Sequence, residues 1–171
     1  MRIKRFVAWL ALLATVALVP STALAAAAPM RVTGGGWFLF GGSIPMQFSF
    51  SGVQHADGSA SGSFHHAYTD DVGSYQFFGT VTCLAFDAAT GRAWIGGVLT
   101  NVISNDPDVG LEAGDDAWFR VLDSPGNDRS TSMGFVGAIE SSEAYCAMRI
   151  WPEGDARTHP VTSGQIKVQA D

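Results

Sequence analysis

The chain has 171 residues, with 16 acidic and 10 basic side chains and a formal net charge of −6 at pH 7. All 16 acids follow residue 55, whereas three of the bases lie within residues 1–5, so the chain beyond them has 16 acids against 7 bases. Such a surface repels phosphate backbones, which argues against nucleic acid as a partner. It also lacks the polybasic segment that anionic lipid attracts.

The first 25 residues have the three parts of a secretory signal peptide. Residues 1–5 are basic, residues 6–19 are apolar, and Ala23-Leu24-Ala25 fits the A-x-A cleavage pattern. The apolar run is shorter than the roughly 20 residues of a membrane-spanning helix. We therefore expect cleavage after residue 25, no membrane span afterwards, and a single domain over residues 26–171 that is secreted or periplasmic.

Two cysteines, Cys83 and Cys146, remain in the exported chain. Two thiols in an oxidising compartment usually pair, whereas in a cytosolic enzyme they would suggest metal binding or catalysis. We predict a disulfide between them. Closing a loop of some 60 residues stabilises a fold by roughly 3–4 kcal/mol in the chain-entropy model.

The first predicted elements form a hairpin. Apolar side chains at Met46, Phe48 and Phe50 alternate with polar ones, which is the two-residue period of a half-buried strand. Asp57-Gly58 is a strong turn signal, and residues 59–68 then predict a more polar return strand.

The central segment predicts a long hairpin. Residues 75–86 and 93–103 are rich in aromatic and β-branched residues, and Gly91 between them suits a positive φ that closes the loop. Further strands are predicted at residues 117–123, 132–139, 145–151 and 164–169.

The fold class that follows is all-β. Eight to ten short strands at regular spacing, with 20 glycines in the chain, indicate one antiparallel β-sandwich or β-barrel after the signal peptide. The sequence leaves these two architectures open.

The acidic segment 105–116 is a calcium candidate. Calcium takes six to eight oxygen ligands, and Asp106, Asp108 and Glu112 would supply carboxylates. The spacing departs from the EF-hand loop, which needs a further acidic ligand and a terminal Glu. The preferred interpretation is a solvated loop with Pro and Gly as turn formers, and calcium is the alternative. No other cofactor is expected.

His65 and His66 form the second candidate. Neighbouring residues on a strand point to opposite faces, so the two imidazoles do not reach one metal ion easily. His66 and Tyr68 share a face, and Asp70 shares it if the strand continues. This trio is either a polar site or an ordinary strand face.

Four tryptophans follow the signal peptide. Trp94 and Trp118 lie inside strong strand patterns and are predicted in the core, whereas Trp151 beside Pro152 is predicted to be exposed. An exposed aromatic on a sheet face is one way in which β-domains bind sugars.

Several segments together are similar to a family of exported bacterial β-proteins. They match its pattern G-x-V-T-C-L at residues 79–84, I-G-G at residues 95–97 and V-x-D at residues 121–123, with Cys146 and residues 164–168 following in order. The resemblance implies an exported β-fold and no particular activity. Residues 123–126, Asp-Ser-Pro-Gly, depart from the family's Asn-Gly-rich turn.

No nucleophile elbow or zinc-protease motif occurs in the sequence. The sequence therefore favours a non-enzymatic extracellular domain, either one that binds a glycan or protein or a structural one. The alternative is a hydrolase-like or isomerase-like enzyme with a polar site around His66 and Tyr68 in a barrel mouth.

Overall fold

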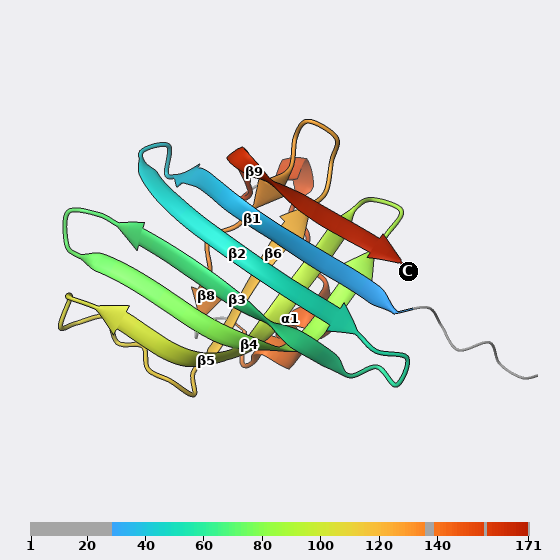
Figure 1. Ribbon diagram of the computed structural model, residues 1–171, viewed down its shortest axis with the longest axis horizontal. Coiled ribbons are helices and arrows are strands. Elements are labelled where there is room, and N and C mark those ends of the chain that lie inside the picture. Colours follow the sequence, from blue (N-terminus) through green and yellow to red (C-terminus); the bar gives the residue numbers. More distant parts are fainter. Residues whose placement is uncertain (1–28, 136–138, 156, 171) are drawn as a thin grey trace, which may run out of the picture.

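The computed structural model describes residues 29–135, 139–155 and 157–170 of the chain (Figure 1). Along them the strands are β1 (Met30–Phe40), β2 (Ile44–Gln54), β3 (Ala60–Thr69), β4 (Ser74–Asp87), β5 (Arg92–Ser104), β6 (Asp116–Leu122), β7 (Arg129–Ser130), β8 (Gly134–Phe135) and β9 (His159–Ala170). Between β8 and β9 lie the helix α1 (Ser142–Met148) and the 3-10 helix η1 (Glu153–Asp155). The predicted signal peptide, residues 1–25, lies outside the described residues.

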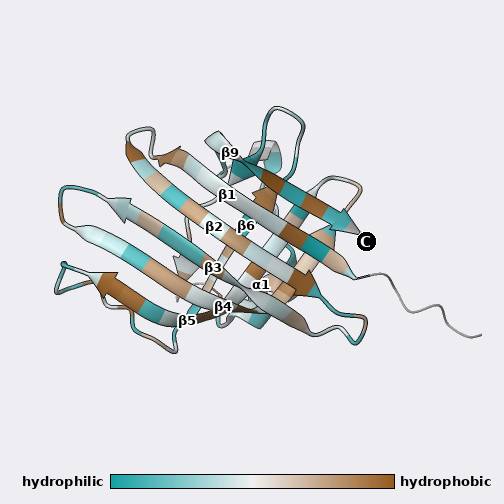
Figure 2. Cartoon of the chain, in the orientation of Figure 1, coloured by the Kyte–Doolittle hydropathy of each residue, from teal (hydrophilic) through white to brown (hydrophobic). Residues whose placement is uncertain are grey.

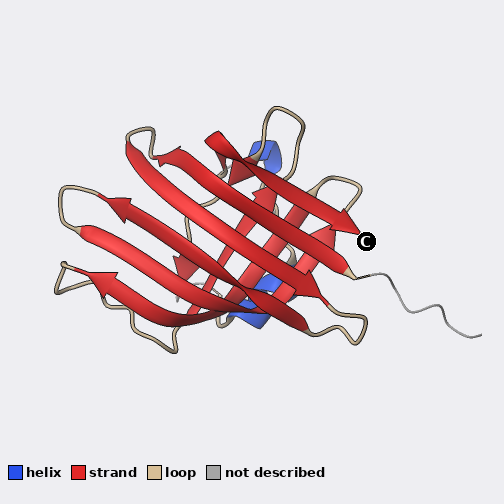
Figure 3. Cartoon of the chain, viewed as in Figure 1, coloured by secondary structure: helices blue, strands red, loops and turns tan. Residues whose placement is uncertain are grey.

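Eight of these strands close an antiparallel β-barrel, which decides between the two predicted architectures. The strand order is β5-β4-β3-β2-β1-β9-β7-β6, and β6 pairs back with β5. The short β8 pairs with β6 at residues 117–118, next to the β7 pairing. Figure 3 shows strands on both sides of the barrel, with little helix.

The barrel interior follows the two-residue period of the sequence. In β2, Phe48 and Phe50 are buried while Gln47 and Ser49 are exposed, as predicted. Hydrophobic and hydrophilic residues alternate along the strands in Figure 2. Phe119 of β6 touches the ring of Phe50 across the barrel, with 5.4 Å between centroids. Aromatic side chains thus fill much of the space between the two sides.

Glycines allow the chain to turn and the strands to approach closely. Gly91 has a φ of +69° in the loop between β4 and β5, as predicted for that position. Gly36 has a φ of +150°, and a Cβ there would overlap the backbone oxygen of Ser163 in β9. A larger residue at position 36 would therefore separate β1 from β9.

The disulfide between Cys83 and Cys146 is confirmed, with 6.2 Å between the two Cα atoms. It joins β4 to α1, which packs on the outside of the barrel against β4, β5 and β6. A second buried cluster lies beneath the helix and includes Trp94, Trp118 and Tyr145. The disulfide therefore anchors the helix over a small core outside the barrel.

The predicted strand over residues 145–151 is wrong, because residues 142–148 form α1. Ser141 caps this helix by accepting a hydrogen bond from the amide of Ala144 at 3.2 Å. Tyr145 and Cys146 are buried together with Ser142, three and four positions before them, which is the period of a helix. The predicted strand over residues 132–139 is confirmed only at residues 134–135, and residues 136–138 lie outside the description.

Trp94 and Trp118 are buried, as predicted. Trp151 is half-buried rather than exposed. Its ring packs edge-on against Trp94, with 5.7 Å between centroids, and the guanidinium carbons of Arg92 and Arg120 lie 4.8 and 5.4 Å from it. This tryptophan packs against the outer cluster.

Candidate functional site

One end of the barrel holds a cavity of about 180 Å³. The turns at residues 41–43 and 70–73 and the loop at residues 105–115 lie at this end, because each connects antiparallel neighbours in the same direction (Figure 1). We call this end the barrel mouth. Its cavity has an apolar lining of Phe40, Ile44, Met46, Phe77, Met133 and Phe135. The polar lining consists of His66, Tyr68, Asp70 and Ser132.

His66 lies at the centre of β3 and points into the barrel. Its paired neighbours are Phe48 on β2 and Phe77 on β4, and its ring meets Phe119 edge-on with 4.7 Å between centroids. The side chain is 1 % exposed. Neither ring nitrogen has a hydrogen-bond partner within the described part of the chain. An imidazole with both nitrogens unpaired among aromatic rings is a costly arrangement, so it requires an explanation.

Burial controls the protonation of this imidazole. It lowers the pKa of His66 from its usual 6.5 to about 3, and the neighbouring charge of His65 acts in the same direction. His66 is therefore neutral at pH 7. A neutral imidazole has one N–H donor and one nitrogen acceptor to offer a ligand.

Two stacked tyrosines stand nearer the mouth. Tyr68 of β3 faces Tyr75 of β4 with 4.6 Å between ring centroids. The hydroxyl of Tyr75 donates to Oδ2 of Asp106 at 2.8 Å, which ties β4 to the loop at residues 105–115. Burial raises the pKa of Tyr68, and the carboxylates of Asp70 and Asp106 raise it further. The pKa of Tyr75 is raised by burial and then by its bond to Asp106.

Asp70 begins the turn between β3 and β4. Its Oδ1 accepts hydrogen bonds from the amides of Val72 and Gly73, both at 3.0 Å. These bonds form an Asx turn, which holds the carboxylate at the edge of the cavity. Oδ2 makes no hydrogen bond or ion pair with any described residue.

The sequence predicted part of this site. His66, Tyr68 and Asp70 share one face, as the alternation along β3 indicates, and all three line the cavity. His65 points the other way and stacks on Phe78 with 4.4 Å between centroids. The contributions of Phe40, Met133 and Phe135 were missed, because Phe40 comes from β1, two strands from β3, and residues 132–135 reach the cavity only when the barrel closes. The exposed apolar Phe40 and Phe135 carried no periodic signal of this role.

The three calcium candidates are not gathered around one point. Both oxygens of Asp106 accept internal hydrogen bonds, from Tyr75 and from the amide of Asp108. Asp108 and Glu112 are exposed, and the amide of Glu112 bonds to Asp115. Among the described residues, no group of three His, Cys, Asp or Glu side chains is arranged to hold a metal ion. Calcium binding stays a prediction that a measurement must test.

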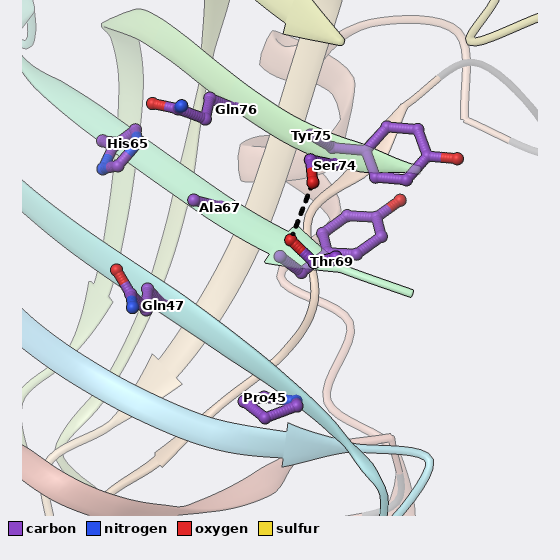
Figure 4. A pocket seen from close by; sticks show the side chains of 9 residues that line it. Pro45, Gln47, His65, Ala67, Thr69, Ser74, Tyr75 and Gln76 are labelled. Atoms are coloured by element: carbon purple, nitrogen blue, oxygen red, sulfur yellow. Dashed lines mark hydrogen bonds between the residues drawn. The ribbon is translucent and has the colours of Figure 1, made fainter. Parts of the chain in front are cut away.

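A second hollow, of about 510 Å³, lies on the outer face of β2, β3 and β4 and extends to Tyr68 and Tyr75 (Figure 4). Gln47 and Gln76 flank Ala67, with His65 at one end. At the other end the hydroxyls of Thr69 and Ser74 bond to each other at 3.0 Å. Its amides and hydroxyls are neutral, and Nε2 of His65 has no hydrogen-bond partner among the described residues.

No helix of the described residues is long enough and apolar enough to cross a membrane. Comparisons of the chain with protein-family models, with curated proteins and with solved structures find no match. The resemblance to exported bacterial β-proteins therefore stays a prediction.

Proposed function

We propose that this protein is an exported binding domain that holds a small, mainly apolar molecule in its barrel mouth. The observation that carries the proposal is His66, which lines the cavity with both ring nitrogens unpaired. A buried polar group without a partner costs roughly 1–3 kcal/mol. A ligand that bonds to the imidazole removes this cost, whereas a purely structural domain gains nothing from it.

The size and lining of the cavity support a compact ligand. A volume of about 180 Å³ is somewhat larger than the roughly 150 Å³ cavity that holds one benzene molecule. Of the ten described residues that line it, six are apolar, and the polar ones are residues 66, 68 and 70 along and just after β3 and residue 132. Binding sites of this kind are apolar with a few placed polar groups. The ligand is therefore a molecule of about one ring with at least one hydrogen-bonding group.

Export is part of the proposal. The disulfide between Cys83 and Cys146 supports it, because disulfides persist mainly in oxidising compartments. A glycan or protein partner, the other expectation from the sequence, would use the outer hollow beside Gln47 and Gln76 rather than the cavity. That expectation stays a separate prediction.

An enzymatic role is the second candidate, because His66, Tyr68 and Asp70 line one cavity. A general base works best when its pKa lies near the working pH. The low pKa of His66 argues for binding, since so weak a base accepts few protons at pH 7. Measuring the pKa of His66 by NMR in a ligand complex separates the two: a value raised toward 7 favours acid–base chemistry.

The proposal is tested with 4-ethylphenol, whose ring fits the cavity and whose hydroxyl can bond to His66. Titration of the mature, oxidised protein, followed by amide NMR, should give saturable shifts in residues 44–46, 66–68 and 132–135. The His66→Phe variant should lose these shifts, whereas His65→Phe, which changes the outward neighbour, should keep them. Shifts confined to Gln47 and Gln76, or no saturable shifts in the wild type, would contradict the proposal.

A further inference from the structure

The three connections at the barrel mouth that join β1 to β2, β3 to β4 and β5 to β6 carry charge of one sign. The turns at residues 41–43 and 70–73 and the loop at residues 105–115 contain six acids and no Lys or Arg. The acids are Asp70, Asp71, Asp106, Asp108, Glu112 and Asp115. On the β9 side, His159 packs edge-on against Phe40, and burial and the neighbouring Arg129 lower its pKa. Arg129 itself donates to Thr158. A cationic ligand is therefore attracted to this end and an anionic one repelled.

Asp70 is the acid that reaches the cavity. Its Oδ1 is fixed by the amides of Val72 and Gly73, and its Oδ2 makes no bond with the described residues. A carboxylate oxygen held in place at the edge of an apolar cavity is a strong acceptor for an ammonium group. Tyr68 adds an aromatic face beside it, and cations bind to such faces.

Three residues along β3 and just after it thus present three different chemical groups to the cavity. His66, Tyr68 and Asp70 lie two residues apart on the inward face, and His66 and Asp70 are about 13 Å apart along an extended strand. The deep end offers a neutral imidazole, the middle an aromatic ring and the outer end a carboxylate. His66, which is buried without a hydrogen-bond partner among the described residues, lines the same cavity as Asp70. The proposed site therefore combines this imidazole with a carboxylate and does not consist of acidic residues alone.

We propose that the ligand class of the barrel mouth is an organic cation: an arylalkylamine with a hydroxyl on its ring. The ammonium group lies between the Oδ2 of Asp70 and the face of Tyr68, the ring fills the apolar cavity, and the hydroxyl bonds to His66. This inference rests on the proposed binding function and adds the charge of the ligand to it. A carboxylate ligand of the same size would meet Asp70 and be rejected.

Three probes of nearly equal size separate charge from shape: tyramine, 4-(2-hydroxyethyl)phenol and 4-hydroxyphenylacetate. At pH 7 tyramine should bind at least about tenfold more tightly than the alcohol, since hydrogen bonds to charged groups contribute more than neutral ones. The carboxylate should show no saturable binding. Calorimetry gives the affinities, and amide NMR shows whether residues 66–70 are involved.

The matched variants are Asp70→Asn and Asp71→Asn, which change the net charge equally. Asp71 is exposed and does not line the cavity. Asp70→Asn should remove the preference for tyramine and leave alcohol binding within about twofold, whereas Asp71→Asn should keep the preference. An asparagine at position 70 keeps an oxygen that can accept from Val72 and Gly73, so the turn is retained.

The outcomes distinguish this inference from the proposed function. If the alcohol binds in the cavity as tightly as tyramine, or if the two variants weaken tyramine equally, the cation inference is wrong and the binding function stands. If none of the three probes binds, and 4-ethylphenol does not bind either, both fail. A preference that disappears at about 0.5 M salt in the wild type would also contradict a direct contact with Asp70, because salt screens distant charges more than adjacent ones.

Discussion

The hydroxyl of Tyr75 donates a hydrogen bond of 2.8 Å to Oδ2 of Asp106, and this bond joins the barrel wall to the acidic loop. The other oxygen of Asp106 accepts from the amide of Asp108, which holds the start of the loop in a turn. Tyr75 also stacks on Tyr68, which lines the cavity. The position of the loop and the shape of the mouth are therefore coupled through one phenol.

We expect Tyr75→Phe to weaken this coupling. The substitution keeps the ring stack with Tyr68 and removes only the hydrogen bond to a carboxylate, so the thermal midpoint should fall by about 3–7 °C. Tyr68→Phe is the matched control, because the Tyr68 hydroxyl makes no hydrogen bond with the described residues. Thermal unfolding followed by circular dichroism measures both. Equal midpoints for the two variants would show that the Tyr75 bond contributes no stability.

The disulfide should contribute through the unfolded chain. Replacing both Cys83 and Cys146 by alanine frees a loop of 63 residues and should lower the free energy of unfolding by roughly 3–4 kcal/mol. Guanidinium unfolding of the oxidised protein and of the double variant measures the difference. In the double variant, the rate of amide hydrogen exchange should increase more in α1 than in β1 and β2, because the disulfide anchors the helix to β4. Uniform loss of protection along the chain would contradict a local anchoring role.

The sequence predicted the strands that follow a simple alternation, and the physical reason is clear in β2. Phe48 and Phe50 face the barrel interior and the residues between and beside them face outward, so buried and exposed residues alternate along this part of the strand. Residues 145–148 of α1 were assigned to a strand over residues 145–151, because the aromatic and β-branched residues Tyr145, Ile150 and Trp151 favour a strand more than Ser141 indicates a helix start. The helix covers a second buried cluster outside the barrel, and no local sequence pattern predicts such a cluster.

The candidate site was predictable only where one strand supplies it. The shared face of His66, Tyr68 and Asp70 follows from the period of β3. The apolar surroundings that leave both ring nitrogens of His66 unpaired include Phe119 from β6, which the sequence of β3 does not reveal. Closure of the barrel also chooses between sandwich and barrel, and it depends on the pairing of β5 with β6 and of β7 with β9. These are long-range pairings that the spacing of strands does not specify.

Calcium binding by Asp106, Asp108 and Glu112 is a further prediction from the sequence. Each carboxylate oxygen can accept more than one bond, so Asp106 can keep Tyr75 while it contacts an ion. With calcium at about 100 times its dissociation constant, the thermal midpoint should rise by roughly 3–6 °C and return in excess chelator. Asp108→Asn should abolish the rise, and Asp71→Asn should not. Identical midpoints with calcium and with chelator would remove the prediction.

Replacing His66 by phenylalanine should abolish ligand binding and increase the stability of the fold. His66→Phe removes two unpaired nitrogens from among Phe48, Phe77 and Phe119, so it should raise the free energy of unfolding at pH 7 by roughly 1–2 kcal/mol. The larger ring also occupies part of the cavity, which abolishes binding of 4-ethylphenol. His65→Phe is the comparison: it removes one unpaired nitrogen, Nε2, from a half-buried ring, so it should raise the free energy of unfolding by less than His66→Phe does. A destabilised His66→Phe would indicate that the imidazole has favourable interactions in the folded state.

The same imidazole should make the wild type sensitive to acid. The pKa of His66 is about 3 when folded and near 6.5 when unfolded, so between these values the unfolded chain binds a proton that the folded chain does not. Stability is therefore fully present above pH 6.5 and decreases as the pH falls toward 3, by up to about 1.4 kcal/mol per pH unit. Burial also lowers the pKa of His65 and His159, which adds smaller effects of the same sign. Guanidinium unfolding at pH 7, 6, 5 and 4 should give a shallower pH dependence for His66→Phe than for the wild type. Parallel curves would mean that His66 takes up its proton in the folded protein.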